Sequence, residues 1–244
     1  MLLKACLNGS RKPGEHPRLP LTQRELADDA LRVVAAGAHA LHIHPRNAQG
    51  AESLAAEDVA AALVAVHQRC PGIPVGVTTG FWIAPDPERR LQHMREWTVR
   101  PDFASVNFSE PGAIDLCTHF LARGIGVEAG LATLADARLL VSSGLADRCL
   151  RVLIEMDEHQ IGSALAMAEE MIGCLDDGMV QIPRLLHGNH QAVVWPLLEE
   201  ALRRGYETRI GLEDTLVLPD GRQAHDNAEL VSRAVSLARQ IGVL

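Results

Sequence analysis

The sequence predicts a single α/β domain, a (β/α)8 barrel of the TIM type that spans residues 1–244. Three observations predict it. Short apolar runs alternate with helix-periodic segments eight times, the units are nearly evenly spaced, and no linker or shift in composition divides the chain. Strict alternation of strand and helix indicates a parallel sheet. Eight such units in about 250 residues are typical of a closed barrel.

Each expected strand is followed by an expected helix. The first helix begins at Thr22, where T-Q-R-E has the pattern of a capping box, and Asp86-Pro87 is a favoured start for the third. We expect strands at residues 2–7, 40–44, 74–78, 103–107, 126–128, 150–154, 183–187 and 208–212. We expect helices at residues 22–36, 55–69, 114–123, 134–142, 162–172, 192–204 and 228–241, besides the one that begins at 86.

A doubly wound open sheet is the main alternative arrangement of these units. No Gly-rich phosphate-binding segment of the G-x-G-x-x-G or Walker type follows any expected strand. That absence favours the barrel.

Composition limits the partners and the location. The net charge is -8, which argues against a nucleic acid partner because phosphate binding needs a basic face. Five cysteines without a CxxC pair indicate reduced thiols in a cytosolic protein. No stretch approaches the roughly 20 apolar residues of a membrane span, and the apolar run at the N-terminus is too short for a signal peptide. We expect a cytoplasmic protein with no membrane partner.

His42 and His44 end the second expected strand. Side chains alternate along a strand, so both imidazoles point to the same face, and chemistry in such barrels lies at the carboxyl ends of the strands. Neutral imidazole suits zinc and related divalent metals, and a catalytic site commonly adds a carboxylate. The H-x-H therefore favours a metal site over two hydrogen-bonded core histidines.

Glu213 and Asp214 end the eighth expected strand, in R-I-G-L-E-D. The first and eighth strands are neighbours in a closed barrel and the second is one further round, so Glu213 can reach the histidine pair. We predict a metal site made of His42, His44 and Glu213. An ion pair with Arg209 can hold Asp214 ionised as a base.

Other polar residues at strand ends have open roles. Arg46 either binds a substrate carboxylate with its two-pronged geometry or bonds loop carbonyls. The residues alone leave the roles of Glu128 and Glu155 open. His187 and His190 are expected to lie behind the ligands or in a plain loop.

Four segments cover almost the whole chain in order: L-N-G-S-R-K with L-P-L-T-Q-R-E-L-A-D-D-A; G-A-H-A-L-H-I-H-P-R-N; V-T-T-G with S-V-N-F-S; and R-I-G-L-E-D-T-L-V-L-P-D-G with N-A-E-L-V. With these segments the chain resembles the β-keto acid cleavage enzymes, the family that includes 3-keto-5-aminohexanoate cleavage enzyme. The fourth segment together with the H-x-H is the most specific part of the match.

The resemblance implies a zinc-dependent barrel, usually a homo-oligomer (a dimer or a tetramer), that converts a β-keto acid and acetyl-CoA into acetoacetate and a new acyl-CoA. The implied reaction is a retro-Claisen condensation in which zinc acts as a Lewis acid. Asp214, oriented by Arg209, is the implied base. The family's metal ligands fall on His42, His44 and Glu213, its other catalytic groups on Arg209, Asp214 and Thr78, and its substrate-facing groups on Asn107, Glu128 and, as the nearest candidate in the first loop, Glu15.

Two departures from the family pattern concern the substrate. Asn47 stands where the family usually has Asp, and Phe81-Trp82 replaces a common glycine pair. The bulky pair is expected to shrink or cover the pocket, which leaves the keto acid and the use of acetyl-CoA open.

Three other functions are alternatives for such a barrel. The first is a metal-dependent aldolase or lyase acting on a small keto acid without CoA. The second is a metal-bearing, ligand-binding barrel without catalysis, which the Arg209 and Asp214 pair disfavours because binding alone requires no base. A metal-dependent hydrolase is disfavoured because its H-x-H would lie on the first strand.

Overall fold

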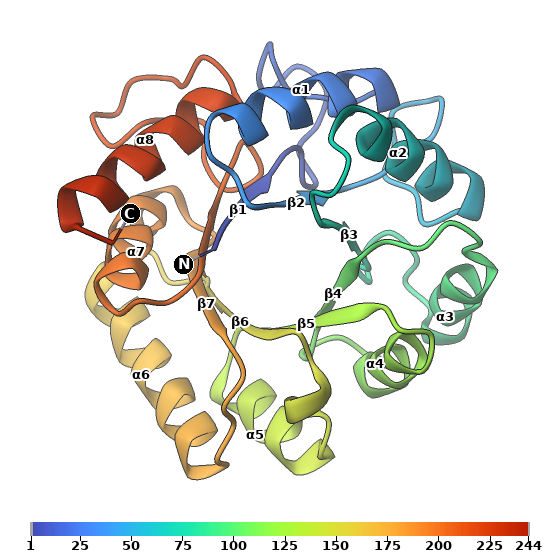
Figure 1. The fold of residues 1–244 in the computed structure, drawn as a ribbon. Helices are drawn as coiled ribbons and strands as arrows, with labels where there is room; N and C mark the ends of the chain where they lie inside the picture. Colours follow the sequence, from blue (N-terminus) through green and yellow to red (C-terminus); the bar gives the residue numbers. More distant parts are fainter. Residues whose placement is uncertain (1, 244) are drawn as a thin grey trace.

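The computed structural model describes residues 2–243, and within them eight parallel strands alternate with eight helices around a central barrel (Figure 1). The strands are β1 (Leu3–Cys6), β2 (Ala40–Ile43), β3 (Val75–Thr78), β4 (Phe103–Asn107), β5 (Gly126–Leu131), β6 (Arg151–Met156), β7 (Arg184–Gly188) and β8 (Thr208–Ile210). The helices are α1 (Gln23–Ala35), α2 (Ala56–Arg69), α3 (Pro87–Glu96), α4 (Ala113–Ala122), α5 (Leu134–Ser143), α6 (Ile161–Asp177), α7 (Gln191–Arg203) and α8 (Asn227–Ile241). The predicted (β/α)8 barrel is confirmed.

The sheet closes between β7 and β8. The strand order runs β7-β6-β5-β4-β3-β2-β1-β8, so β8 lies beside β1, and β1 beside β2. β7 and the residue before β8 are joined by a parallel bridge between Leu185 and Glu207 and by a hydrogen bond of 3.0 Å from Leu186 N to Glu207 O. Thr208 Oγ1 donates to Leu186 O at 3.0 Å. The end of β8 is thus brought within one strand of β2.

The expected helix starts are present. Thr22 Oγ1 accepts from Glu25 N at 3.2 Å, and the Glu25 carboxylate accepts from Thr22 N at 2.9 Å, which completes the capping box of α1. Asp86 caps α3 by accepting from Arg89 N, with Pro87 as the first helical residue. These side chains satisfy backbone donors that a helix otherwise leaves unpaired.

Phe103 fills the base of the barrel. A Cβ on Gly76 of the adjacent β3 would lie 1.9 Å from the Phe103 ring, so only glycine leaves room for it. The side chains of Lys4 and Arg151 lie over the same ring, 5.7 and 5.8 Å from its centroid. The interior is therefore filled with side chains below the level at which the strands end.

Strand ends differ from expectation in two informative places. β5 was expected to end at residue 128 but runs to Leu131, because the small residues Ala129 and Gly130 pair with β4 on one side and β6 on the other. Glu128 consequently lies three residues before the end of its strand, inside the barrel. β8 is shorter than expected and ends at Ile210, where Gly211 packs so closely on β1 that a Cβ would lie 1.9 Å from Cys6 O.

Two further expectations concern the state of the cysteines and helices that could span a membrane. All five cysteines are free thiols, and four of them are buried. Within residues 2–243, no helix combines the length and the apolar composition needed to cross a membrane.

Candidate metal centre and active site

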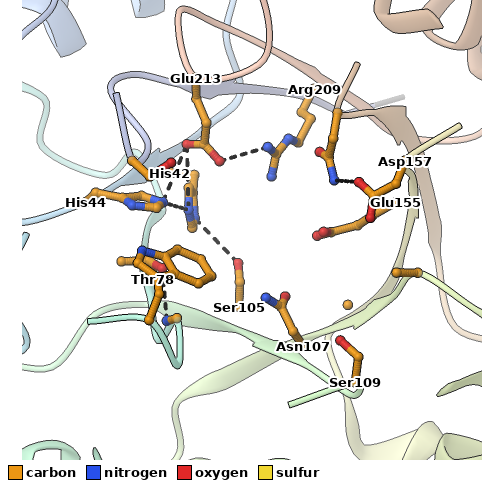
Figure 2. Close-up of a pocket in the computed structure, with 16 residues that line it drawn as sticks. His42, His44, Thr78, Ser105, Asn107, Ser109, Glu155, Asp157, Arg209 and Glu213 are labelled. Carbon is orange, nitrogen blue, oxygen red and sulfur yellow. Dashed lines mark hydrogen bonds and ion pairs between the residues drawn. The ribbon is translucent and has the colours of Figure 1, made fainter. Parts of the chain in front are cut away.

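A cavity of about 350 Å³ opens at the carboxyl ends of the strands (Figure 2). This is the end of a (β/α)8 barrel at which enzymes of this fold carry out chemistry. It is lined by Ser10, His42, His44, Thr78, Gly80, Trp82, Ser105, Asn107, Ser109, Gly130, Ala132, Glu155, Asp157, Asn189, Arg209 and Glu213. The lining is mostly polar, as a site for a small charged ligand requires.

His42, His44 and Glu213 meet on one wall of the cavity. Nε2 of His42 lies 3.1 Å from Nε2 of His44, and Oε2 of Glu213 lies 3.9 and 3.7 Å from these two nitrogens. Two nitrogen ligands of a tetrahedral zinc ion lie about 3.3 Å apart. Oε2 of Glu213 is buried and has no hydrogen-bond partner among the described residues. The three predicted ligands therefore converge on one point, with the two imidazole nitrogens facing each other and Oε2 of Glu213 beside them.

The far nitrogens of both imidazoles are held by other side chains. Ser105 Oγ donates to Glu128 Oε2 at 2.9 Å, so its oxygen is left to accept from Nδ1 of His42 at 3.4 Å. Nδ1 of His44 lies 2.5 Å from Oε1 of Glu52, as a donor to that carboxylate. With a proton on each Nδ1, both rings would present an unprotonated Nε2 to the cavity. Two facing lone pairs repel each other unless a cation lies between them, which fits a divalent metal.

Backbone contacts position the ligands. Asn8 at the end of β1 bonds both backbone groups of His44, with Nδ2 donating to His44 O and Oδ1 accepting from His44 N, each at 2.9 Å. Gly9 adopts a positive φ of 53°, and a Cβ there would lie 2.4 Å from Glu213 Cγ. The first loop therefore fixes one histidine and leaves space for the glutamate.

The electrostatic surroundings keep His42 neutral. Burial lowers the pKa of His42 well below its ordinary value, and the nearby His44 lowers it further. A neutral imidazole is the form that binds metal.

Arg209 joins Glu213, one of the predicted ligands, to Asp214. Its Nη2 donates to Glu213 Oε1 at 2.8 Å and to Asp214 Oδ1 at 2.5 Å, and its Nε donates to Asp214 Oδ1 at 2.9 Å. Burial raises the pKa of Asp214 and the charge of Glu213 adds to this rise, while Arg209 opposes it. Arg209 lies on the cavity wall, whereas Asp214 lies behind it with a side chain that is 1% exposed. Oδ2 of Asp214 has no partner among residues 2–243.

Two more expected site residues lie on the wall. Thr78 lines the cavity from the end of β3, and its Oγ1 accepts from Gly80 N at 3.2 Å. Asn107 lines it from β4, with Nδ2 donating to Glu110 Oε1 at 3.1 Å. Trp82 also lies on the wall, stacked on His44, whereas Phe81 packs against Arg90 away from it.

Three expected substrate-binding residues lie off the wall. Glu128 is fully buried below the cavity, bonded to Lys4 Nζ at 2.5 Å and Arg151 Nη1 at 3.1 Å, because β5 continues past it. Arg46 donates to the carbonyls of Gly9, Arg11 and Gly50, the second of the two roles considered for it. Glu15 accepts from Lys12 N and Arg11 Nη1 in a partly exposed loop.

Several site residues were not singled out from the sequence. Glu52 reaches His44 because residues 46–52 form a small hairpin with an antiparallel bridge from Arg46 to Glu52. Asn47 makes its turn by accepting from Gln49 N and Ala51 N with Oδ1. A polar turn followed by Gly50 was the available signal for this hairpin. Asn189 directly follows β7, where polar residues are expected, and Asp157 directly follows β6, which runs to Met156 rather than to the expected residue 154.

A sequence model of the family described as beta-keto acid cleavage enzyme matches residues 1–119 and 129–243. The chain belongs to this family. The expected family resemblance is confirmed. The match leaves out residues 120–128, the stretch that includes Glu128.

Curated β-keto acid cleavage enzymes match along almost the whole chain. A 3-keto-5-aminohexanoate cleavage enzyme of Acetoanaerobium sticklandii is 23% identical over 99% of this chain and 93% of its own length. The counterpart in Fusobacterium nucleatum is 24% identical over 99% of this chain and 92% of its length. A 3-oxoadipate:acetyl-CoA acetyltransferase of Cupriavidus necator is 25% identical over 99% of this chain and 89% of its length.

Solved structures support the fold. The apo structure of ObcA superposes with a TM-score of 0.67 at 22% identity, over 92% of this chain. This chain spans 63% of the ObcA chain in that comparison. The complex of ObcA with a C4-CoA adduct and oxalate superposes with a TM-score of 0.66 at 21% identity, over 92% of this chain and 65% of that one.

Proposed function

We propose that this protein is a metal-dependent β-keto acid cleavage enzyme that converts a β-keto acid and acetyl-CoA into acetoacetate and an acyl-CoA. The observation that carries the proposal is the convergence of Nε2 of His42, Nε2 of His44 and the unpartnered Oε2 of Glu213 on one wall of the cavity. His42, His44 and Glu213 would hold the metal, for which we propose zinc. When bound, the metal would supply a Lewis acid for the keto oxygen of the substrate.

Arg209 and Asp214 supply a cation for the substrate carboxylate and a base. Arg209 keeps Nε and Nη2 on Glu213 and Asp214, so its outer nitrogen Nη1 is the one left to bind a substrate carboxylate. Asp214 keeps Oδ1 on Arg209, which leaves Oδ2 as the atom that accepts a proton. A raised pKa makes its carboxylate a stronger base than an ordinary aspartate.

Thr78 and Asn107 orient the substrate from β3 and β4, since both lie on the wall. Glu128 acts at a distance, through Ser105 on His42, rather than by touching the substrate. We do not assign Arg46 or Glu15 to the substrate, because their polar groups bond loop atoms.

The relatives support the use of CoA but leave the keto acid open. The Cupriavidus necator relative is named an acetyl-CoA acetyltransferase, and ObcA has been solved with a C4-CoA adduct. The relatives' names include a keto acid with an amino group and one with a second carboxylate.

A product assay tests the proposal. Purified, zinc-loaded protein is incubated with acetyl-CoA and a panel of β-keto acids, and acetoacetate and acyl-CoA are measured by mass spectrometry. We expect both products with at least one keto acid and none after chelation of the metal. Cleavage in the absence of acetyl-CoA would favour the aldolase or lyase alternative, and no reaction with any keto acid would contradict the proposal.

A further inference from the structure

The cavity has two ends of opposite character. The proposed metal ligands lie at one end and the carboxylates of Glu155 and Asp157 at the other, while Arg209, which is bonded to Glu213, lies between the two ends (Figure 2). Among the described residues on the wall, Arg209 is the sole arginine or lysine. A ligand whose keto and carboxylate groups lie at the metal end therefore has its distal end against two carboxylates.

Glu155, near the end of β6, offers its carboxylate to the cavity. Its side chain is 17% exposed, and Nε2 of His187 lies 3.6 Å from Oε1, beyond hydrogen-bonding distance. Burial raises the pKa of Glu155, but the imidazole of His187 and the charge of Arg209 outweigh it and bring this pKa to about 2. Glu155 is therefore an ionised acceptor that faces the space where a ligand would lie.

Asp157 adds a second carboxylate at the same end. Its Oδ1 accepts from Nδ2 of Asn189 at 2.8 Å, a contact that joins the loops after β6 and β7. Gly130 on β5 keeps space beside these groups, since a Cβ there would lie 2.8 Å from Asn107 Oδ1 and 3.4 Å from Glu155 Oε1. The acidic end is thus open to a ligand rather than filled by a side chain.

We propose that Glu155, assisted by Asp157, selects a β-keto acid whose distal end carries an ammonium group. The inference rests on the proposed function, because the metal end defines where the keto acid group lies. Carboxylates bind an N–H-bearing cation through charge-assisted hydrogen bonds and repel a second carboxylate. A quaternary ammonium group is typically bound by aromatic rings, and the one Phe, Tyr or Trp ring on the described wall, that of Trp82, stacks on His44 at the metal end.

Equilibrium binding tests the inference without turnover. Three 3-hydroxy acids of equal length, which differ only in a distal amino, methyl or carboxylate group, are titrated by calorimetry into the zinc-loaded protein. We expect the amino compound to bind at least tenfold more tightly than the methyl compound, and the carboxylate compound to bind most weakly. Glu155→Gln should remove about 10- to 100-fold of the affinity for the amino compound alone. Equal binding of the amino and methyl compounds, or a preference that survives Glu155→Gln, would overturn the inference.

Glu158→Gln is the matched control, because it removes one charge from the loop that follows β6 but not from the cavity wall. Zinc content and the unfolding midpoint check that each variant is intact, and Asp157→Asn carries the same comparison if Glu155→Gln does not fold. In the product assay, Glu155→Gln should raise the KM for an amino keto acid more than it lowers kcat. An effect confined to the KM for acetyl-CoA would overturn the inference. Absence of products with every keto acid would instead refute the proposed function.

Discussion

Oε1 of Glu52 lies 2.5 Å from Nδ1 of His44, and Oε2 of the same carboxylate accepts from Nε1 of Trp82 at 3.1 Å. One side chain therefore orients a proposed metal ligand and the aromatic ring beside it on the cavity wall. A carboxylate on the far nitrogen of a metal-ligating histidine fixes its tautomer and raises its basicity.

Glu52→Gln is expected to weaken zinc binding by about 10- to 100-fold, the usual cost of removing a carboxylate behind a histidine ligand. Competition with a chromogenic chelator measures the affinity. Glu57→Gln, on the exposed side of the first turn of α2, is the control and should bind zinc as the parent does. An unchanged affinity for Glu52→Gln would show that His44 needs no such partner.

His42→Ala is expected to abolish stoichiometric zinc binding, because it removes one of three donors. Metal content after dialysis, measured by atomic emission, checks this. His225→Ala is the matched control, since the His225 side chain is 66% exposed in the loop before α8 and lies outside the cavity wall. One full equivalent of zinc in His42→Ala would refute the metal site.

Asp214→Asn is expected to keep its zinc and to lower kcat by about 100- to 10,000-fold, the range typical of removing a general base. The amide still accepts from Arg209, so Arg209 and Glu213 should stay in place. Parallel assays of zinc content and turnover separate the two effects. Loss of zinc would show that Asp214 positions the proposed ligand Glu213 rather than acting as a base. Unchanged turnover would show that Asp214 takes no part in the reaction.

Asp29 on α1 is expected to make folding stability depend on pH. Burial raises its pKa from 3.8 to about 6, against the opposing hydrogen bond from Asn227 and the charge of Arg32. In the unfolded chain Asp29 loses its proton near pH 4, whereas the folded chain retains it up to about pH 6. The stability associated with the protonated carboxyl is therefore full below pH 4 and is lost as pH rises to about 6.

Asp29→Asn is expected to remove this loss of stability at higher pH, because the amide does not titrate. Between pH 4 and pH 7, the free energy of unfolding of the variant relative to the parent should increase by up to about 3 kcal/mol. Urea denaturation at a series of pH values gives this difference directly, and any constant cost of the substitution cancels. A difference that does not vary with pH would contradict the raised pKa.

Lys4 and Glu128 form an ion pair in which both side chains are 0% exposed. Lys4→Met is expected to lower the free energy of unfolding by about 3 kcal/mol, because it leaves a buried carboxylate with less compensating charge. Lys4→Met combined with Glu128→Gln should recover part of that loss. If Lys4→Met alone costs less than about 1 kcal/mol, Arg151 suffices as a partner for Glu128.

The sequence by itself determined the barrel and the three side chains that converge, His42, His44 and Glu213. Alternation of strands and helices is a local pattern, and the topology of such chains leaves few arrangements. Period two along a strand placed His42 and His44 on one face, and closure of the sheet placed β8 one strand away from them. Both arguments hold for any chain with this pattern. They therefore predict that residues 44 and 213 meet, although these residues lie far apart in the sequence.

Only the tertiary structure decided what surrounds the ligands. Glu128 was expected at the mouth of the barrel, but its depth depends on how far β5 pairs with both neighbours, and small residues past it gave no sign of a strand end. Glu52 reaches His44 through a hairpin, and Arg46 binds loop carbonyls because that hairpin folds over the first loop. Glu155 faces the cavity, whereas Asp214 lies behind Arg209. Depth along a strand and the partner of a loop side chain depend on register and packing between distant segments, which hydrophobic periodicity does not encode.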